Sequence, residues 1–294
     1  MKLHEVIQKK RESVSFEFFP PKDDAAEKKL FAIIRKLESL KPDLVSVTYG
    51  AGGSTSKNTR KLVNWIKTET ALEPMPHLTC VDQSSEELKT ILEDYRSMGV
   101  ENVLALRGDP PQGSTQFVAP EGGYCYAANL VSLAAQMKHF SIGVACYPEG
   151  HIEAVDRKSD LRYTKAKIDA GAHFAITQMF FDNRYFYDYV ERAREVGINV
   201  PIIPGIMPIF DLNRIGDFCD KCGATLPETA VERLKGASPD EAKRIGRDIV
   251  TEQVLDLVKH GVRSFHFYTM NQADTVIDIY VRAGLDKLQS IGNP

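Results

Sequence analysis

The sequence predicts an α/β fold, a single (β/α)₈ barrel with extra helices before the last strand. Three observations lead to this prediction. Eight short runs rich in apolar residues alternate with longer helical patterns along the 294 residues. Most of these runs are almost continuously apolar, as expected of parallel strands buried on both faces. No Pro/Gly/Ser-rich linker interrupts the chain, so residues 1–294 are expected to form one domain, with residues 1–12 as an N-terminal helical segment.

The predicted elements follow one another in a regular order. The first barrel helix, residues 24–40, places four apolar residues on one face: Leu30, Ile33, Ile34 and Leu37. The eight expected strands are residues 13–19, 44–50, 75–81, 102–108, 141–147, 174–181, 200–206 and 264–270.

Later helices carry recognisable start and stop signals. Ser84 or Ser85 is expected to cap the helix that closes at Gly99, and Gly171 and Gly197 are expected to end two further helices. The stretch 207–262 is too long for one crossover helix. It should hold two or three, for example residues 230–237 and 240–261.

Composition excludes several classes of function. The net charge of −3 and the pI near 6.2 argue against nucleic acid as a partner. The apolar runs are too short to span a bilayer, and the charged N-terminal segment does not resemble a secretory signal. Five cysteines suit a reducing cytoplasm better than a disulfide framework. The sequence therefore predicts a cytoplasmic protein that handles small molecules, without a membrane partner.

Cys219 and Cys222 form the one C-x-x-C pair in the sequence. A structural zinc would need two more ligands at suitable spacing, which the neighbouring sequence lacks. A redox pair is the functional alternative, but the surrounding stretch is typical of a helix end. The spacing of His and carboxylate residues predicts no metal site.

Polar residues gather at the expected C-terminal ends of the strands, where barrels of this class carry their catalytic groups. "RGD" at residues 107–109 is a weak motif, and a histidine in an apolar strand is more often a core group than a ligand. Residues 50–54, "GAGGS", lack the spacing of a dinucleotide-binding loop. The polar set is Glu17, Thr48, Tyr49, His77, Thr79, Arg107, Asp109, Tyr147, Glu149, His151, Gln178, Tyr268 and Asn271.

Glu17 is the residue of greatest interest, because it stands in the middle of the apolar strand "SVSFEFF". It could pair with an interior Arg or Lys. Alternatively, burial beside Phe16, Phe18 and Phe19 would raise its pKa and make it a proton donor near neutral pH. The residues alone thus indicate a barrel with a polar mouth and one interior carboxylate, but not a substrate.

Eight ordered blocks extend this interpretation. Together they are similar to the bacterial 5,10-methylenetetrahydrofolate reductase family over about residues 13–285. The blocks are "VSFEFFPPK", "KPDLVSVTYGAGG", "PHLTC", "ALRGDPP", "ACYPEGH", "AITQMFFD", "IIPGIMP" and "FHFYTMN".

The resemblance implies a flavoprotein of one-carbon metabolism and methionine biosynthesis, with non-covalent FAD at the barrel mouth. NADH or NADPH would reduce the flavin and leave, and methylenetetrahydrofolate would then take the hydride at the same face in a ping-pong reaction. It also implies a homo-oligomer. A C-terminal regulatory domain of the kind found in longer eukaryotic relatives is not expected, and neither is control by S-adenosylmethionine.

The resemblance also assigns roles to residues. Glu17 matches the general acid that protonates the folate N10, and Asp109 matches the aspartate near the flavin and the pterin. Gln178 matches a glutamine that contacts both folate and nicotinamide, and Phe218 is expected to pack against either of them. The positions that match FAD contacts are Thr48, His77, Arg107, Gly108, Asp109, Tyr126, Ala127, Tyr147, His151, Ala154, Asp160 and Lys167.

The sequence departs from the family pattern at several positions. Arg214 stands where a folate-contacting glutamine is usual, and Gln272 stands where an arginine is usual, so the two could offset each other across the folate tail. Tyr163 and Ala166 replace polar FAD contacts, and the loop 110–125 is longer than in enterobacterial members. Two other hypotheses stay open: the same chemistry fed by ferredoxin or an accessory subunit, and a non-catalytic flavin- or folate-binding barrel.

Overall fold

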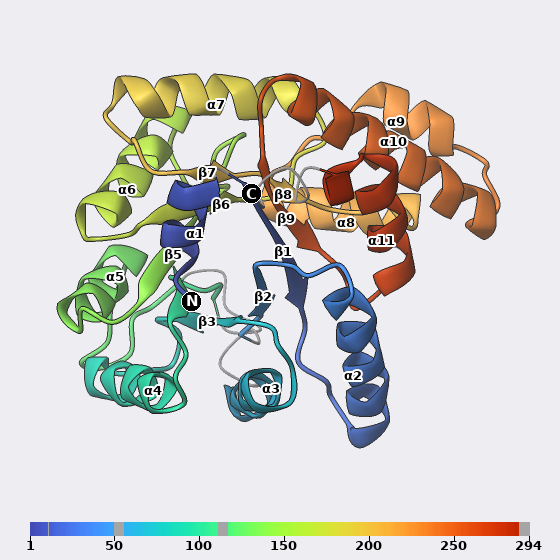
Figure 1. Ribbon diagram of the computed structural model, residues 1–294. Coiled ribbons are helices and arrows are strands. Elements are labelled where there is room, and N and C mark those ends of the chain that lie inside the picture. The colour runs from blue at the N-terminus through green and yellow to red at the C-terminus, as the bar shows by residue number, and fades with distance from the viewer. Residues whose placement is uncertain (11, 50–55, 111–116, 288–294) are drawn as a thin grey trace.

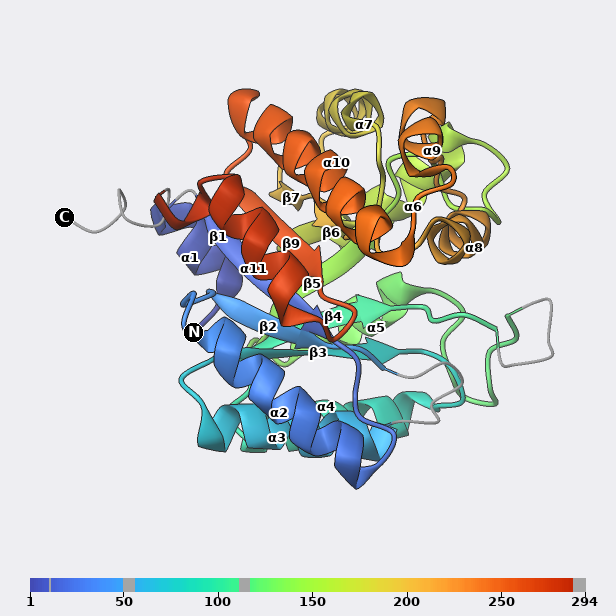
Figure 2. The ribbon, with the colours of Figure 1, turned by 90° about the vertical axis from the view of Figure 1, so that its right-hand side faces the viewer.

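The computed structural model describes residues 1–10, 12–49, 56–110 and 117–287, which form a parallel barrel surrounded by helices (Figures 1 and 2). The glycine-rich residues 50–54 and part of the long loop 110–125 lie outside the described residues. The strands are β1 (Ser13–Phe18), β2 (Leu44–Val47), β3 (Pro74–Thr79), β4 (Asn102–Leu106), β5 (Ser141–Cys146), β6 (Phe174–Thr177), β7 (Ile202–Ile203), β8 (Gly205–Ile206) and β9 (Ser264–Tyr268).

The described strands pair in parallel in the order β7-β6-β5-β4-β3-β2-β1-β9-β8, so the (β/α)₈ prediction is confirmed. The segment 200–206 was expected as one strand, and here the prediction was wrong in detail. Pro204 divides it into β7, which pairs with β6, and β8, which pairs with β9. Proline has no N–H to donate, yet the Pro204 carbonyl still accepts from His266 N at 3.0 Å, which helps to close the barrel.

The helices surround the barrel, and their ends follow the expected signals. Ser84 caps α4 through a capping box with Glu87. Gly99, Gly171 and Gly197 adopt positive φ just after helix ends. The helices are α1 (Leu3–Lys10), α2 (Asp24–Glu38), α3 (Ser56–Glu69), α4 (Ser85–Ser97), α5 (Ala127–Gln136), α6 (Arg157–Asp169), α7 (Asn183–Glu195), α8 (Leu212–Cys222), α9 (Glu228–Leu234), α10 (Pro239–Lys259) and α11 (Ala273–Arg282).

Three helices, α8 to α10, fill the stretch before β9, in agreement with the expected extra helices. Helix α8 lies toward the end of the barrel opposite to α1 (Figure 2). Among the residues described, no helix is long and apolar enough to cross a membrane.

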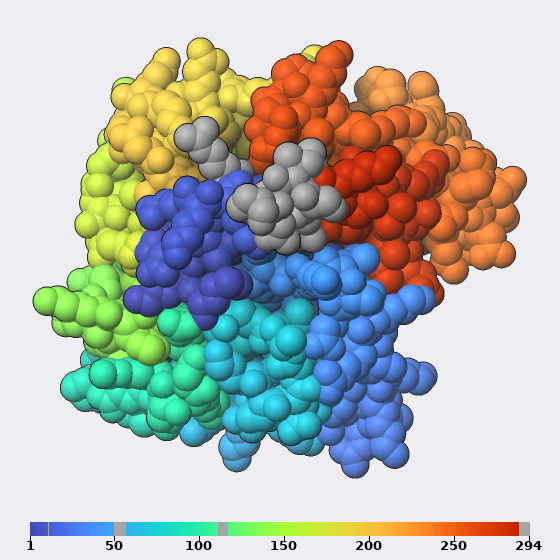
Figure 3. Space-filling view, in the orientation of Figure 1, coloured from blue at the N-terminus to red at the C-terminus, as the bar shows by residue number. Residues whose placement is uncertain are grey.

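The lower half of the barrel interior, where the strands begin, is apolar. Phe174 is fully buried there, and a Cβ on Gly143 would lie 2.5 Å from its ring, so only glycine fits beside it. Helix α1 closes this end by inserting Leu3 and Ile7, and in Figure 3 the dark-blue N-terminal segment lies on this face, just left of its middle. The remaining members of this cluster are Leu44, Met75, Leu104, Ile176 and Ile203.

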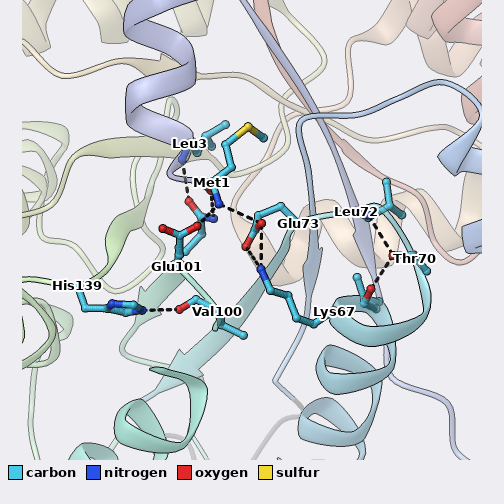
Figure 4. A network of polar contacts seen from close by, with 11 residues as sticks. Met1, Leu3, Lys67, Thr70, Leu72, Glu73, Val100, Glu101 and His139 are labelled. Carbon is cyan, nitrogen blue, oxygen red and sulfur yellow. Dashed lines mark hydrogen bonds and ion pairs between the residues drawn. The ribbon is translucent and has the colours of Figure 1, made fainter. Parts of the chain in front are cut away.

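Polar contacts fasten α1 to the strand starts (Figure 4). Leu3 N donates to Asn102 Oδ1 at 2.8 Å, and Asn102 Nδ2 donates to Met1 O at 2.8 Å. The amino group of Met1 pairs with Glu73 and Glu101. The N-terminal helix is therefore a plug for the lower half of the barrel.

Candidate active site

The upper half of the interior, where the strands end, is polar. Successive side chains of a strand point to opposite faces, so Ser15 and Glu17 of β1 point inward while Phe16 and Phe18 point to the surrounding helices. The ring centroid of Phe16 lies 5.9 Å from that of Phe267 and 6.4 Å from that of Tyr280 on α11. The aromatic residues that flank Glu17 in sequence therefore belong to the outer core and do not surround its carboxylate.

Glu17 instead lies between two imidazoles. Its Oε2 is 3.3 Å from His266 Nε2 and 3.3 Å from His77 Nε2, and the residue is only 6% exposed. Burial alone would raise the pKa of Glu17, but His77 and His266 outweigh burial and lower the pKa to about 2. The expectation of a raised pKa was therefore wrong, because it rested on neighbours in sequence rather than neighbours across the barrel.

His266 is a functional candidate that the sequence reasoning missed. It is fully buried, and its Nδ1 lies 2.7 Å from Ser15 Oγ. The edge of its ring meets Tyr268, whose hydroxyl donates to Thr177 O at 2.7 Å. Side chains two residues apart in a strand point to the same face. His266 therefore shares the inward face of Tyr268, which the sequence places among the polar residues of the mouth.

Several buried polar atoms in the upper half have no hydrogen-bond partner within the described chain. They are His77 Nε2, which approaches Glu17 without hydrogen-bond geometry, Thr79 Oγ1 and Ser46 Oγ. Gly108 packs directly on this layer, since a Cβ there would lie 2.9 Å from Thr79 Cβ. Unpaired buried polar atoms cost stability, so these three atoms on the inward face near Glu17 suit a site that receives a polar ligand.

A second cluster lies between β5 and α6. Lys167 Nζ donates to Ala145 O at 2.6 Å and lies 5.9 Å from the ring centroid of Tyr147. Asp160 is buried; burial raises its pKa and the charge of Lys167 opposes that rise. Burial lowers the pKa of Lys167 in turn. The ring of His151 meets that of Tyr147 edge to face at 4.7 Å, so an acid, an amine and two rings share one region.

Further toward the surface, Arg107 makes a two-pronged ion pair with Glu153, with Arg107 Nη2 2.7 Å from Glu153 Oε1. Tyr126 and Tyr163 stack with centroids 5.9 Å apart and planes inclined by 18°. Tyr126 is 55% exposed and Tyr163 53% exposed, so the pair offers an open aromatic surface. The structure also places the start of α5 at Ala127, beside Tyr126, and a half-buried Ala154 before α6.

The expected folate residues occupy two regions. Arg214 and Phe218 lie together on α8, with the guanidinium 5.9 Å from the ring centroid. Gln272 directly precedes α11 and lines a groove of about 370 Å³ shared with α2. Asp109 is exposed. Burial is the main cause of the raised pKa of Tyr147, and the negative charge of Asp109 adds to that rise.

Other singled-out residues have structural contacts. Gln83 Nε2 donates to Tyr49 OH, Glu149 accepts from Thr225 N, and Asn271 bonds both backbone groups of Phe19. Thr48 directly follows β2 and is half-buried, and its carbonyl accepts from Thr59 Oγ1. Gln178 Oε1 accepts from Met179 N at 2.9 Å.

The C-x-x-C pair lies at the end of α8. Burial raises the pKa of Cys219 to about 11 and also raises the pKa of Cys222, so both thiols are poor nucleophiles. Within the described ranges, no cluster of three or more His, Cys, Asp or Glu side chains is arranged to hold a metal ion.

The fold and the site define a (β/α)₈-barrel enzyme whose polar chemistry is gathered at the C-terminal mouth. Solved structures agree on the fold. An uncharacterized protein from Clostridium thermocellum, described as binding two copies of 5-methyl-5,6,7,8-tetrahydrofolic acid, matches with a TM-score of 0.63 at 10% identity, covering 98% of this chain and 100% of that one. Oxaloacetate acetylhydrolase matches with a TM-score of 0.52 at 13% identity, covering 100% of this chain and 88% of that one.

Sequence comparison identifies the family. The family model for methylenetetrahydrofolate reductase matches residues 2–284. The 5,10-methylenetetrahydrofolate reductase of Escherichia coli is 42% identical over 89% of this chain and 87% of its own length, and that of Buchnera aphidicola is 40% identical over 96% and 97%. Methylenetetrahydrofolate reductase (NADH) 1 of Arabidopsis thaliana is 39% identical over 97% of this chain and 50% of its own length. The chain belongs to the methylenetetrahydrofolate reductase family and is an oxidoreductase of one-carbon folate metabolism.

Proposed function

We propose that this protein reduces 5,10-methylenetetrahydrofolate to 5-methyltetrahydrofolate with FAD as its cofactor and NADH or NADPH as the electron donor. The observation that supports this proposal most strongly is the buried Glu17 between two imidazoles, inside a mouth whose other polar atoms lack partners. A non-catalytic barrel would gain nothing from carrying such groups at a cost in stability. The assembly is expected to be a homo-oligomer.

The residues of the mouth suit FAD chemically. His77 Nε2 and Thr79 Oγ1 are buried and unpartnered beside Gly108, where a polar ring edge could pair with them. Lys167 carries a positive charge for a pyrophosphate, and Asp160 can accept from a ribose hydroxyl. The exposed Tyr126–Tyr163 surface suits an adenine ring. When bound, FAD would supply the hydride chemistry, taking a hydride from the nicotinamide and later giving one to the folate.

The protein's own contribution is proton transfer and positioning. The folate must open its five-membered ring before it can accept a hydride, and protonation of N10 promotes this opening. Glu17 is the proposed donor of that proton, since its carboxyl group lies inside the mouth and its Oε2 is in contact with His266. Asp109 would favour the cationic ring-opened folate through its negative charge. Gln178, Arg214, Phe218 and Gln272 are proposed to position the substrate.

Anaerobic half-reactions test this proposal. Purified holoenzyme is mixed with NADH or NADPH, and the flavin absorbance is followed; methylenetetrahydrofolate is then added to the reduced enzyme. We expect one nicotinamide to bleach the flavin and the folate to restore its colour. A flavin that only a reduced ferredoxin or a partner subunit bleaches would replace the electron donor in the proposal. A purified protein that binds no flavin even when FAD is added would overturn it.

A further inference from the structure

The contacts of His266 limit where its protons can lie. Ser15 Oγ lies 2.7 Å from His266 Nδ1 and 3.4 Å from Phe265 O, and its one hydroxyl hydrogen can be donated to only one of them. When the hydroxyl donates to Phe265 O, Nδ1 carries the hydrogen of the shorter contact, and a neutral imidazole would then present a bare lone pair at Nε2. Glu17 Oε2 lies 3.3 Å from that Nε2. Two acceptors this close repel each other unless one proton lies between them.

We propose that Glu17 and His266 share a single proton, and that His266 is the positioning residue which stores it until the folate binds. In the free enzyme the proton lies on His266 Nε2 and Glu17 is a carboxylate. When the folate fills the mouth and excludes water, an ion pair becomes less favourable than a neutral pair, and the proton moves to Glu17 Oε2. This inference rests on the proposed function and adds a second residue to its proton path.

The proton transfer is balanced at each step. The Nε2–H bond of His266 breaks as the O–H bond of Glu17 forms, which leaves a neutral imidazole protonated at Nδ1. The O–H bond of Glu17 then breaks as the N10–H bond of the folate forms. The pair regains one proton from solvent when the product leaves and the mouth is open again. No oxidant or reductant takes part in these transfers.

The surroundings of His266 contain few other groups that could hold this proton. Strand β1 contributes Ser15 and Glu17, β8 contributes the apolar Gly205 and Ile206, and His266's own strand contributes Tyr268, with its hydroxyl committed to Thr177 O. Across the barrel, His77 faces the same carboxylate oxygen but makes no hydrogen bond to it. The charge of His77 acts together with that of His266 to lower the pKa of Glu17, and so it favours the carboxylate form of Glu17.

The substitution His266→Gln tests the proposal, because a glutamine amide can still donate to Glu17 but cannot release a proton. We expect flavin reduction by the nicotinamide to keep its rate. The folate half-reaction should become about 10- to 100-fold slower near pH 8 and approach the wild-type rate near pH 5, where Glu17 can carry the proton alone. Ser15→Ala should shift the pH profile in the same direction by less. His139→Gln, a matched change far from the mouth, should leave both half-reactions unchanged.

Different results would overturn the shared-proton proposal and the proposed function. A His266→Gln enzyme whose folate half-reaction is slowed equally at every pH, or whose two half-reactions slow together, would overturn the shared-proton proposal while leaving the proposed function standing. Failure of the wild-type enzyme to pass electrons from nicotinamide to folate would overturn the proposed function itself.

Discussion

The two halves of the barrel interior are built by the same strands and differ in almost every physical property. Strand β3 contributes Met75 to the lower half and His77 to the upper half, and β6 contributes Phe174 below and leads to Gln178 above. The lower half is apolar, closely packed and plugged by α1. The upper half contains buried polar atoms without partners. The comparison indicates that, within the barrel interior, the lower half contributes apolar packing, whereas the upper half carries polar groups at a cost in stability.

The largest expected effect is on the rate of the folate half-reaction when Glu17, the carboxylic acid of the upper half, is replaced. Glu17→Gln should leave flavin reduction by the nicotinamide nearly unchanged and slow the folate half-reaction by about 10²- to 10⁴-fold, since only that step needs a proton. Stopped-flow absorbance measures both steps.

The same substitution at the lower end provides the control. Glu73→Gln weakens contacts with Lys67 and Met1 but should leave both half-reactions unchanged. Equal losses in the two half-reactions of Glu17→Gln would contradict the division of roles between the two halves.

The next largest effect is on stability. Phe174→Ala removes a fully buried ring from the lower half and should reduce the free energy of unfolding by about 3–5 kcal/mol, from lost burial and the cavity left behind. Denaturant unfolding followed by circular dichroism measures this loss. Val196→Ala, at an exposed position after α7, should change it by no more than about 0.5 kcal/mol. A similar small change for both variants would show that the lower half is not the stabilising region.

A smaller effect on stability is expected when the pH is lowered, because two histidines pack together where α1 closes the barrel. His4 and His173 stack with ring centroids 4.2 Å apart, and burial lowers the pKa of His173 from 6.5 to about 4. The folded protein therefore binds fewer protons than the unfolded chain in this window. The free energy of unfolding should therefore be unaffected by His173 above about pH 6.5 and should decrease as the pH falls toward 4. The expected decrease is about 1–2 kcal/mol after allowance for the partial exposure of His173.

Unfolding midpoints measured across that pH range check this prediction. His173→Gln, which keeps an acceptor for Ile142 N, should show a flatter profile. An unchanged slope in the variant would remove His173 from the explanation.

The smallest effect concerns the aromatic surface at the mouth. Tyr163→Ala should weaken FAD binding by several-fold, corresponding to about 1 kcal/mol for one aromatic contact, and should leave FMN binding unchanged because FMN lacks the adenine. Flavin fluorescence during titration of the apoprotein measures both affinities. Equal weakening for FAD and FMN would assign Tyr163 a structural role instead.

The fold could be predicted from the sequence because buried parallel strands leave continuous apolar runs and helix ends leave Ser and Gly signals. Ser84 and Gly99 bound α4 as expected. The break at Pro204 follows from the missing N–H of proline, yet the apolar run around it concealed the two short strands. The stacking of His4 on His173 at the plug joins residues far apart in the chain and leaves no signal in the sequence.

The site was less predictable, because its contacts join strands far apart in the sequence. Glu17 could be singled out as a charge in an apolar strand, but its environment is set by His77 and His266, 60 and 249 residues away in the chain. Neighbours in sequence point to the opposite face of a strand, which is why Phe16 and Phe18 were misleading. The pKa of Glu17 therefore depends on contacts that only the folded barrel brings together.

Infrared difference spectroscopy tests the central claim most directly. The spectrum of oxidised holoenzyme is compared before and after methylenetetrahydrofolate binds, when no hydride is available and the complex is stable. We predict that folate binding produces a protonated-carboxyl band that is present in the wild type and missing in Glu17→Gln. Absence of that band from the wild-type difference spectrum, or its persistence in Glu17→Gln, would contradict proton transfer from His266 to Glu17.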